Sequence, residues 1–337
     1  MSPAPTRPAP RVRTDVTHVL ETQNPLVAAP GDSPVHHVRV ALDTRLRALI
    51  QHDPGTRSGV DIEDLHQMRV SVRRMRAALR SARPLLDAQW ADALRAELGW
   101  LGGALGPVRD LDVMLLRLRG EVATLSSSEE EAGQVLVAEL ERERDEARAE
   151  MLSALDAPRY SALLERIADA VRLPLPTPSA MQQQPALIDL VRTEARKLSS
   201  AVRKAGPDPE DETLHALRIL GKRVRYTGEL VEPSLRGTTQ GKQVKQLMSA
   251  TADLQEVLGD HQDACVAEQR IRELLDALGQ RPDLDGEAGE LDAYVVFVAG
   301  RLVERERHRA EAKRAEWWDA WAAVRDRAAT LGRPTSG

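Results

Sequence analysis

The chain has 337 residues, a formal net charge of -5 at pH 7 and 42% hydrophobic residues, while aromatic residues make up only 3%. This length and apolar content allow a substantial core, and the frequent Ala, Leu, Arg and Glu favour helices over strands. The single cysteine, Cys265, excludes an internal disulfide framework, and no window approaches the roughly 18 apolar residues of a membrane-spanning helix. We therefore expect an all-α, cytoplasmic protein with no membrane partner.

Proline-rich residues 1–34 predict a disordered leader and contain no secretory signal. Amphipathic segments then follow in two series, over 35–172 and 186–331, separated by the Pro- and Gln-rich linker 173–185 and followed by a short tail, 332–337. Because short loops join the segments of each series, each series should form an antiparallel bundle of about four helices.

Apolar periodicity and the positions of Gly and Pro set the predicted helix boundaries. In the first series, Pro54 should end the first helix, and Gly106-Pro107 should separate the third helix from the fourth. The predicted helices span residues 35–51, 61–86, 89–105, a segment from 108 onward, 130–151 and 160–171, and in the second series 186–204 and 211–231.

One helix of each series carries the same cationic pattern. His66-x-x-Arg69-x-x-x-Arg73-Arg74-x-Arg76 recurs as His215-x-x-Arg218-x-x-x-Lys222-Arg223-x-Arg225. At about 100° per residue, positions 66, 69, 73 and 76 fall within roughly 80° of one face, next to an apolar stripe. Like charges at this spacing repel, and no Asp or Glu between His66 and Arg83 offsets them. The pattern therefore predicts a surface that binds an anion from outside the chain.

A second duplicated element follows each cationic helix. Leu105-Gly106-x-x-x-Asp110 recurs as Leu258-Gly259-x-x-x-Asp263, but Arg109 and Asp112 are replaced by Gln262 and Cys265. Without a histidine cluster at ligand spacing, we expect Asp110, Asp112 and Asp263 to cap helices or orient arginines rather than to bind metal. The replacement of Arg109 predicts a site that is not symmetric.

In these two elements the chain resembles a CHAD domain over roughly residues 35–330. The resemblance implies two homologous four-helix bundles, related by pseudo-two-fold symmetry around a basic channel that binds inorganic polyphosphate without catalysis. It also implies an association with triphosphate-hydrolysing domains, whose Glu-x-Glu-x-Lys signature is absent from this sequence. Targeting to polyphosphate granules and partnership with polyphosphate-metabolising enzymes are the corresponding expectations.

We expect the cations of both helices and their neighbours to contact polyphosphate, with no cofactor and no metal. A bound polyanion should favour the protonated forms of His66 and His215, so that affinity rises as pH falls through about 6–7. Arg74 and Arg223 lie off the main stripe and could instead bridge to neighbouring helices or to the other half. The predicted contacts are His66, Arg69, Arg73, Arg74, Arg76, Arg80, Arg109, His215, Arg218, Lys222, Arg223 and Arg225, with Arg39, Arg45, Arg196 and Lys197 on the first helix of each half.

Two other functions stay open from the sequence. A metal-dependent phosphohydrolase would need His36, His37, His52-Asp53 and His66 to converge on a divalent ion, but the second half has no counterpart for the first three histidines. A generic nucleic-acid-binding protein would place aromatic residues among its cations for base stacking, and the motif helices offer only Tyr226. Polyphosphate is thin and has no bases, so it fits an enclosed channel better than a duplex does.

Overall fold

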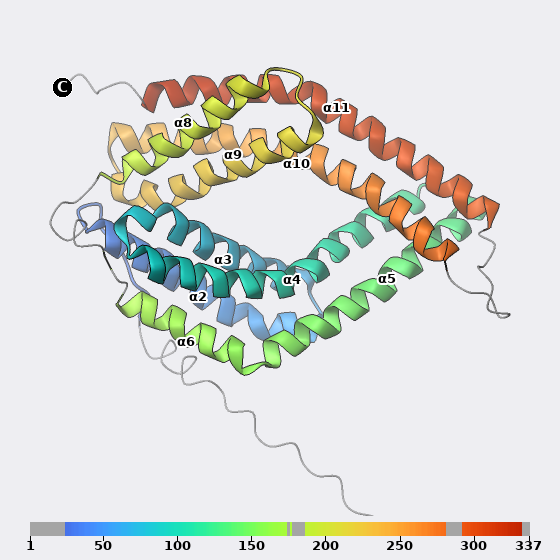
Figure 1. Ribbon diagram of the computed structural model, residues 1–337, viewed down its shortest axis with the longest axis horizontal. Coiled ribbons are helices and arrows are strands. Elements are labelled where there is room, and N and C mark those ends of the chain that lie inside the picture. The colour runs from blue at the N-terminus through green and yellow to red at the C-terminus, as the bar shows by residue number, and fades with distance from the viewer. Residues whose placement is uncertain (1–23, 174–175, 177–185, 281–291, 332–337) are drawn as a thin grey trace, which may run out of the picture.

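The computed structural model describes residues 24–173, 176, 186–280 and 292–331. Within these ranges the chain forms nine α-helices, two short 3-10 helices and no β-strand, which confirms the predicted all-α class (Figure 1). The helices of the first half are α2 (Pro34–Ser58), α3 (Ile62–Ser81), α4 (Ala88–Val122), α5 (Ser127–Asp156) and α6 (Pro158–Arg172). Those of the second half are α8 (Ile188–Ala205), α9 (Asp211–Val231), α10 (Thr239–Gly279) and α11 (Ala293–Leu331). No described helix is both long and apolar enough to cross a membrane.

Two prolines predicted to end helices lie inside them instead. α2 continues past Pro54 to Ser58, and Gly59 then takes the left-handed conformation, with φ 69°, that closes the helix. α4 runs unbroken through Pro107, so the predicted break between residues 105 and 108 is wrong. A proline removes one backbone donor and crowds the carbonyl four residues earlier. α4 accommodates both effects by a change of direction along its length, which is visible in Figure 1.

The other boundaries follow the sequence more closely. α9 spans residues 211–231 as predicted. α3 ends at Ser81 rather than at residue 86, because the following Arg83–Leu85 segment, with Pro84 at its centre, forms a 3-10 turn. Most of the predicted leader, most of the linker and the tail lie outside the described residues.

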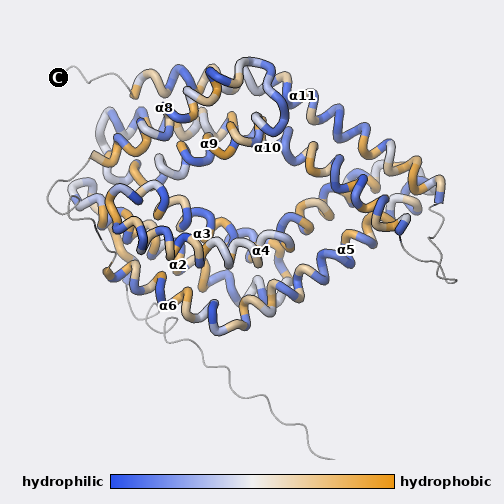
Figure 2. Tube along the Cα trace, in the orientation of Figure 1, coloured by the Kyte–Doolittle hydropathy of each residue, from blue (hydrophilic) through white to orange (hydrophobic). Residues whose placement is uncertain are grey.

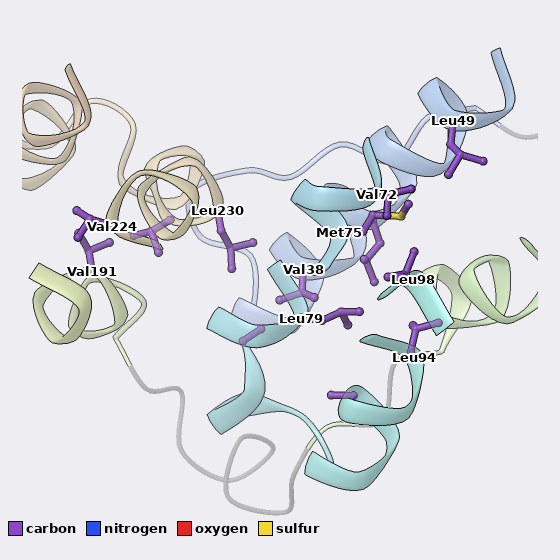
Figure 3. Close-up of a cluster of buried hydrophobic side chains, with 14 of the residues drawn as sticks. Val38, Leu49, Val72, Met75, Leu79, Leu94, Leu98, Val191, Val224 and Leu230 are labelled. Atoms are coloured by element: carbon purple, nitrogen blue, oxygen red, sulfur yellow. The ribbon is translucent and has the colours of Figure 1, made fainter. Parts of the chain in front are cut away.

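The principal core runs without interruption through both halves (Figure 3). Val38 of α2 and Met75 of α3 belong to the same cluster as Val191 of α8 and Val224 of α9, and all four side chains are fully buried. Burial of an apolar side chain of this size contributes about 1.5–3 kcal/mol. This core therefore fixes which faces of α3 and α9 are left for their cations.

A second apolar cluster joins the two halves at the far ends of their long helices. α4 and α5 supply Leu115 and Leu136, and α10 and α11 supply Leu274 and Leu302. Hydrophobic and hydrophilic residues alternate along these helices, and the four helix ends meet at the right of the view (Figure 2). Between this junction and the contact of α3 with α9, the backbones of α4 and α10 stand apart (Figure 1). Sequence analysis does not predict the distal junction, because periodicity shows that a face is apolar but not which helix covers it.

Candidate anion-binding site

The apolar stripe of α3 positions its cationic stripe. Met68, Val72 and Met75 have no exposed surface, so the helix is held by one face. Its cations occupy the adjacent sector. A hydrogen bond of 2.7 Å between Ser81 Oγ and Thr227 Oγ1 joins α3 to α9, so the cations of α3 lie beside those of α9. The two motif helices, 149 positions apart at His66 and His215 in the chain, therefore contribute to one site.

Arg73 of α3 and Lys222 of α9 stand at the centre of this shared site. Burial, together with the neighbouring Arg218 and Arg73, lowers the pKa of Lys222 to about 8 against an opposing effect of Asp263. Burial likewise lowers the pKa of Arg73, and cations from both helices, Arg218 and Arg225 among them, add to the shift while Tyr226 opposes it. The cations of each helix thus disfavour the protonated form of a cation on the other helix, and an anion bound between the helices would offset this repulsion.

Five cations of the two motif helices have no carboxylate within 4.0 Å in the described part of the chain; they are Arg73, Arg76, Arg80, Lys222 and Arg223. The Nε atoms of Arg73 and Arg223 are also buried without a hydrogen-bond partner there. Buried donors in native proteins are almost always satisfied. These two arginines can therefore donate to a hydrogen-bond acceptor that the described residues do not supply.

Arg80 extends the site along α3. Its pKa is lowered by burial and then by Arg223 of α9, with Arg95 of α4 adding to the effect. Glu194 of α8 acts in the opposite direction on Arg80. Sequence analysis missed Arg95 and Glu194, because neither belongs to a repeated motif and only the packing of α4 and α8 brings them to α3.

The duplicated aspartates position one arginine in each half. Asp110 accepts from Arg69 Nη1 at 2.6 Å, and the same nitrogen donates to the carbonyl of Gly106 at 3.3 Å. In the second half, Arg218 lies 3.8 Å from Asp263 and passes close to Gly259. The expectation that these aspartates orient arginines is confirmed, while Asp112 pairs with Arg144 at 3.2 Å.

The two histidines have different surroundings. Burial lowers the pKa of His66, and Arg109 is the strongest of the cations that lower it further. His215 Nδ1 instead forms a 2.8 Å hydrogen bond with Gln262 Oε1, where the first half has Arg109. The replacement noted in the sequence therefore changes the partner of the histidine, and only His66 stands beside an additional cation from the following helix.

Arg74 bridges the halves, as one of the two sequence interpretations allows. Its Nε lies 3.1 Å from Glu229 Oε2 on α9, and Glu229 also lies 3.5 Å from Arg225. Burial and Arg74 lower the pKa of Arg45, which lines a cavity of about 420 Å³ together with Arg74, Tyr226 and Glu229. Arg74 is thus partly neutralised by a structural partner.

The remaining cations of the first helices are engaged elsewhere. Arg39 donates to the carbonyl of Val171 on α6 at 2.7 Å. Arg196 donates to the carbonyl of Arg192 within α8, and Lys197 pairs with Glu194 at 2.7 Å. The structure therefore brings Arg45 near the cations of α3, but it gives Arg39 and Arg196 backbone partners on α6 and α8.

The histidines of the alternative phosphohydrolase do not converge. His36 contacts the carbonyl of Val27, and His52 Nδ1 contacts Asp64 at 2.7 Å. Asp53 is occupied by Arg57 and by the hydroxyl of Tyr160. Among the described residues, the group whose ligand atoms could share a metal ion lies elsewhere, at the start of α9.

These features define an all-α module in which two packed helices present unpaired cations to one space. The model of the CHAD domain family matches residues 40–272, and the chain belongs to this family.

Known relatives and solved structures agree with this assignment. The chain is 28% identical over 249 residues to the uncharacterized proteins MT2285 and Rv2226 of two Mycobacterium tuberculosis strains, which covers 72% of this chain and 45% of each relative. The chain thus spans less than half the length of these curated relatives. It superposes with a TM-score of 0.66 and 24% identity on PptA from Streptomyces chartreusis, covering 88% of this chain and 100% of that one. The CHAD domain from the plant Ricinus communis gives the same score and identity, with 90% and 95% covered. These two similarities show the fold.

Proposed function

We propose that this protein binds inorganic polyphosphate between α3 and α9, without catalysing a reaction on it. The observation that carries the proposal is the adjacency of Arg73 and Lys222. Arg73 helps to lower the pKa of Lys222, Arg218 and Arg225 of α9 help to lower the pKa of Arg73, and neither Arg73 nor Lys222 has a carboxylate within ion-pairing distance in the described part of the chain. Cations held together at such a cost are typical of a site whose ligand is a polyanion.

The chemistry of the site favours a linear phosphate polymer over nucleic acid. Arginine presents a planar fork of donors that matches phosphate oxygens, and most of the site cations are arginines. Tyr226 is the aromatic residue in contact with the cations, through Arg225 at 5.4 Å from its ring centroid. Single-stranded nucleic acid calls for successive stacking platforms, whereas polyphosphate needs only positive charge along its path.

The kind of groups present supports binding without turnover. Hydrolysis of a phosphoanhydride needs an activated water, supplied in helical phosphohydrolases by a metal held among histidines and carboxylates. Arg73, Lys222 and their neighbours can neutralise charge but cannot hold such a metal. We therefore place the protein as a polyphosphate-binding module of the cytoplasm, recruited to polyphosphate granules or to enzymes of polyphosphate metabolism.

The experiment is titration calorimetry of long-chain polyphosphate against the protein and two double variants. R73E/K222E should abolish binding with unchanged helicity, because charge is reversed at the centre of the site. R166E/K204E is the matched control: it makes the same change in net charge at exposed residues of α6 and α8 and should bind normally. Equal loss in both variants would reduce the site to a generic electrostatic effect. Displacement of polyphosphate by duplex DNA at physiological salt would favour the nucleic-acid alternative.

A further inference from the structure

At the start of α9, next to the cationic site, three side chains from two helices converge. Asp211 is the first residue of α9, and His261 and Cys265 lie one turn apart on α10. His261 Nε2 lies 3.2 Å from Asp211 Oδ1 and 3.8 Å from Cys265 Sγ, and Cys265 Sγ lies 3.8 Å from Asp211 Oδ2. None of the three belongs to the polyphosphate contacts proposed above.

We propose that Asp211, His261 and Cys265 form a zinc site that ties α9 to α10. Tetrahedral zinc binds sulfur at about 2.3 Å and nitrogen or oxygen at about 2.0–2.2 Å, which places the ligand atoms about 3.4–3.6 Å apart. The separation of 3.8 Å between His261 Nε2 and Cys265 Sγ and that of 3.2 Å between His261 Nε2 and Asp211 Oδ1 lie close to this value, and one ligand atom from each of the three residues lies within 4.8 Å of the other two. A mixed sulfur, nitrogen and oxygen set selects zinc over magnesium or calcium.

The surroundings of the three groups support a site built for a cation. His261 is 2% exposed, and its Nδ1 has no hydrogen-bond partner in the described part, so its polar contacts are those toward Asp211 and Cys265. Arg314 of α11 donates to Asp211 Oδ1, the oxygen that also faces His261, and contacts Asp208 as well; hydrogen bonds of this kind orient metal-binding carboxylates. The Asp211 side chain is 58% exposed, so an ion can reach the three side chains from solvent.

The site exists in the second half alone. Alignment of the duplicated motifs puts Ile62, Val108 and Asp112 at the positions of Asp211, His261 and Cys265. Two of these three cannot ligate a metal, and Asp112 is paired with Arg144. The departure from symmetry at residue 265, which polyphosphate binding does not explain, is accounted for by a metal. Gln262 is adjacent to His261 in the chain and hydrogen-bonds to His215 of the cationic site. Metal binding at His261 would therefore restrict the position of His215.

Cobalt titration of the full chain, with no polyphosphate present, tests the proposal. One equivalent of Co²⁺ per chain should produce tetrahedral visible bands and thiolate charge-transfer absorption, and Zn²⁺ should displace it. The thiol loses its proton to the buffer on binding, so both bands should weaken as pH falls. C265S should remove the charge-transfer band, and H261A and D211N should each weaken affinity by more than about 10-fold, since even outer-shell partners contribute about 10- to 100-fold.

Two controls keep the result specific. H308A removes an exposed histidine of α11 and should change nothing, and R73E/K222E should retain the cobalt spectrum even where polyphosphate binding is lost. Because Cys265 is the single thiol of the chain, its reaction with a thiol reagent reports directly on the site, and Zn²⁺ should slow that reaction in the unmodified protein. Absence of a thiolate band together with an unprotected thiol would overturn the proposal, as would an unchanged spectrum in H261A.

Discussion

Arg74 of α3 and Glu229 of α9 form an ion pair, with Nε and Oε2 3.1 Å apart, between residues 155 positions apart in the chain. The same carboxylate lies 3.5 Å from Arg225, so one acid serves a cation from each motif helix. This acid holds together two helices whose remaining cations repel one another. The site therefore contains a local counter-charge at Glu229, in addition to the aspartates that position Arg69 and Arg218, while cations such as Arg73 and Lys222 stay unpaired in the described part of the chain.

The variant E229Q tests whether the ion pairs of Glu229 serve stability rather than binding. The amide keeps the shape of the side chain but loses the charge, and both partners are roughly 30% exposed, so the free energy of unfolding should fall by about 1 kcal/mol. Polyphosphate should bind at least as tightly, because a competing carboxylate is gone. Urea unfolding and calorimetry measure the two effects. E316Q, which breaks the exposed pair with Lys313, should cost less than about 0.5 kcal/mol.

Lys222 predicts a pH dependence of binding. With its pKa lowered to about 8, the free protein loses this charge as pH rises from about 7 to 9, so polyphosphate affinity should fall across that range and binding should take up a proton. K222R is the matched test, since arginine stays charged and should remove this pH dependence while binding persists. An affinity of K222R that falls as steeply as that of the parent protein would assign the dependence to another group.

The same shift has an opposite consequence for stability. Between pH about 8 and its ordinary value of 10.5, Lys222 is neutral when folded and protonated when unfolded. The unfolded state then binds more protons, so the contribution of this residue to stability rises with pH over that window. Stability of the ligand-free protein measured from pH 8 to 10 should therefore increase relative to that of K222R, and a decrease would contradict the assigned pKa.

The surroundings of His66 lower the pH range in which its protonation should strengthen polyphosphate binding. Its pKa is lowered by burial and by Arg109, so its protonation should strengthen binding below the unperturbed region of about 6.5 rather than through pH 6–7. Calorimetry from pH 7 to 5 with H66N tests this, because asparagine does not titrate. H215N is the comparison in the half that lacks Arg109.

Arg80 tests how far the polyanion extends along α3. Each phosphate contact adds about one unit to the slope of log affinity against log salt concentration in nucleic-acid complexes, and the same counterion release applies to polyphosphate. R80A should reduce that slope by about one, whereas R166A on the exposed face of α6 should leave it unchanged. Equal slopes for the parent protein, R80A and R166A would show that bound polyphosphate does not contact Arg80.

Two glycines of the distal junction predict opposite stability changes. A Cβ at Gly133 of α5 would lie 2.8 Å from Val122, a fully buried and β-branched side chain, so G133A should cost about 1–3 kcal/mol. A Cβ at Gly120 of α4 meets nothing within 4 Å, so G120A should stabilise by up to about 1 kcal/mol through helix propensity. Thermal unfolding of both variants measures the difference. Equal effects would show that the distal helices are not packed as described.

Some helix boundaries and residue roles could be predicted from the sequence, and others could not. The helix over 211–231 is read correctly because its apolar stripe, acidic first turn and following Pro233 agree with one another. The breaks predicted at Pro54 and Pro107 are wrong, because proline costs one hydrogen bond and a bend, and packing on both sides outweighs that cost in a long helix. The role of Asp110 follows from its repeated spacing after the cationic helix. The role of Glu229 does not follow from sequence, since nothing in one helix shows which arginine of the other it will face.

The sequence by itself determined the helical class, the duplicated cationic helices and the family, because periodicity and motif spacing are local properties of a helix. Only the tertiary structure decided which cations are paired, which lie unpaired beside the other half, and that Asp211, His261 and Cys265 meet. The physical reason is that pairing depends on distances of a few ångströms between side chains far apart in the chain. Those distances are set by which apolar faces bury one another, here Val38 and Met75 with Val191 and Val224 in one shared core.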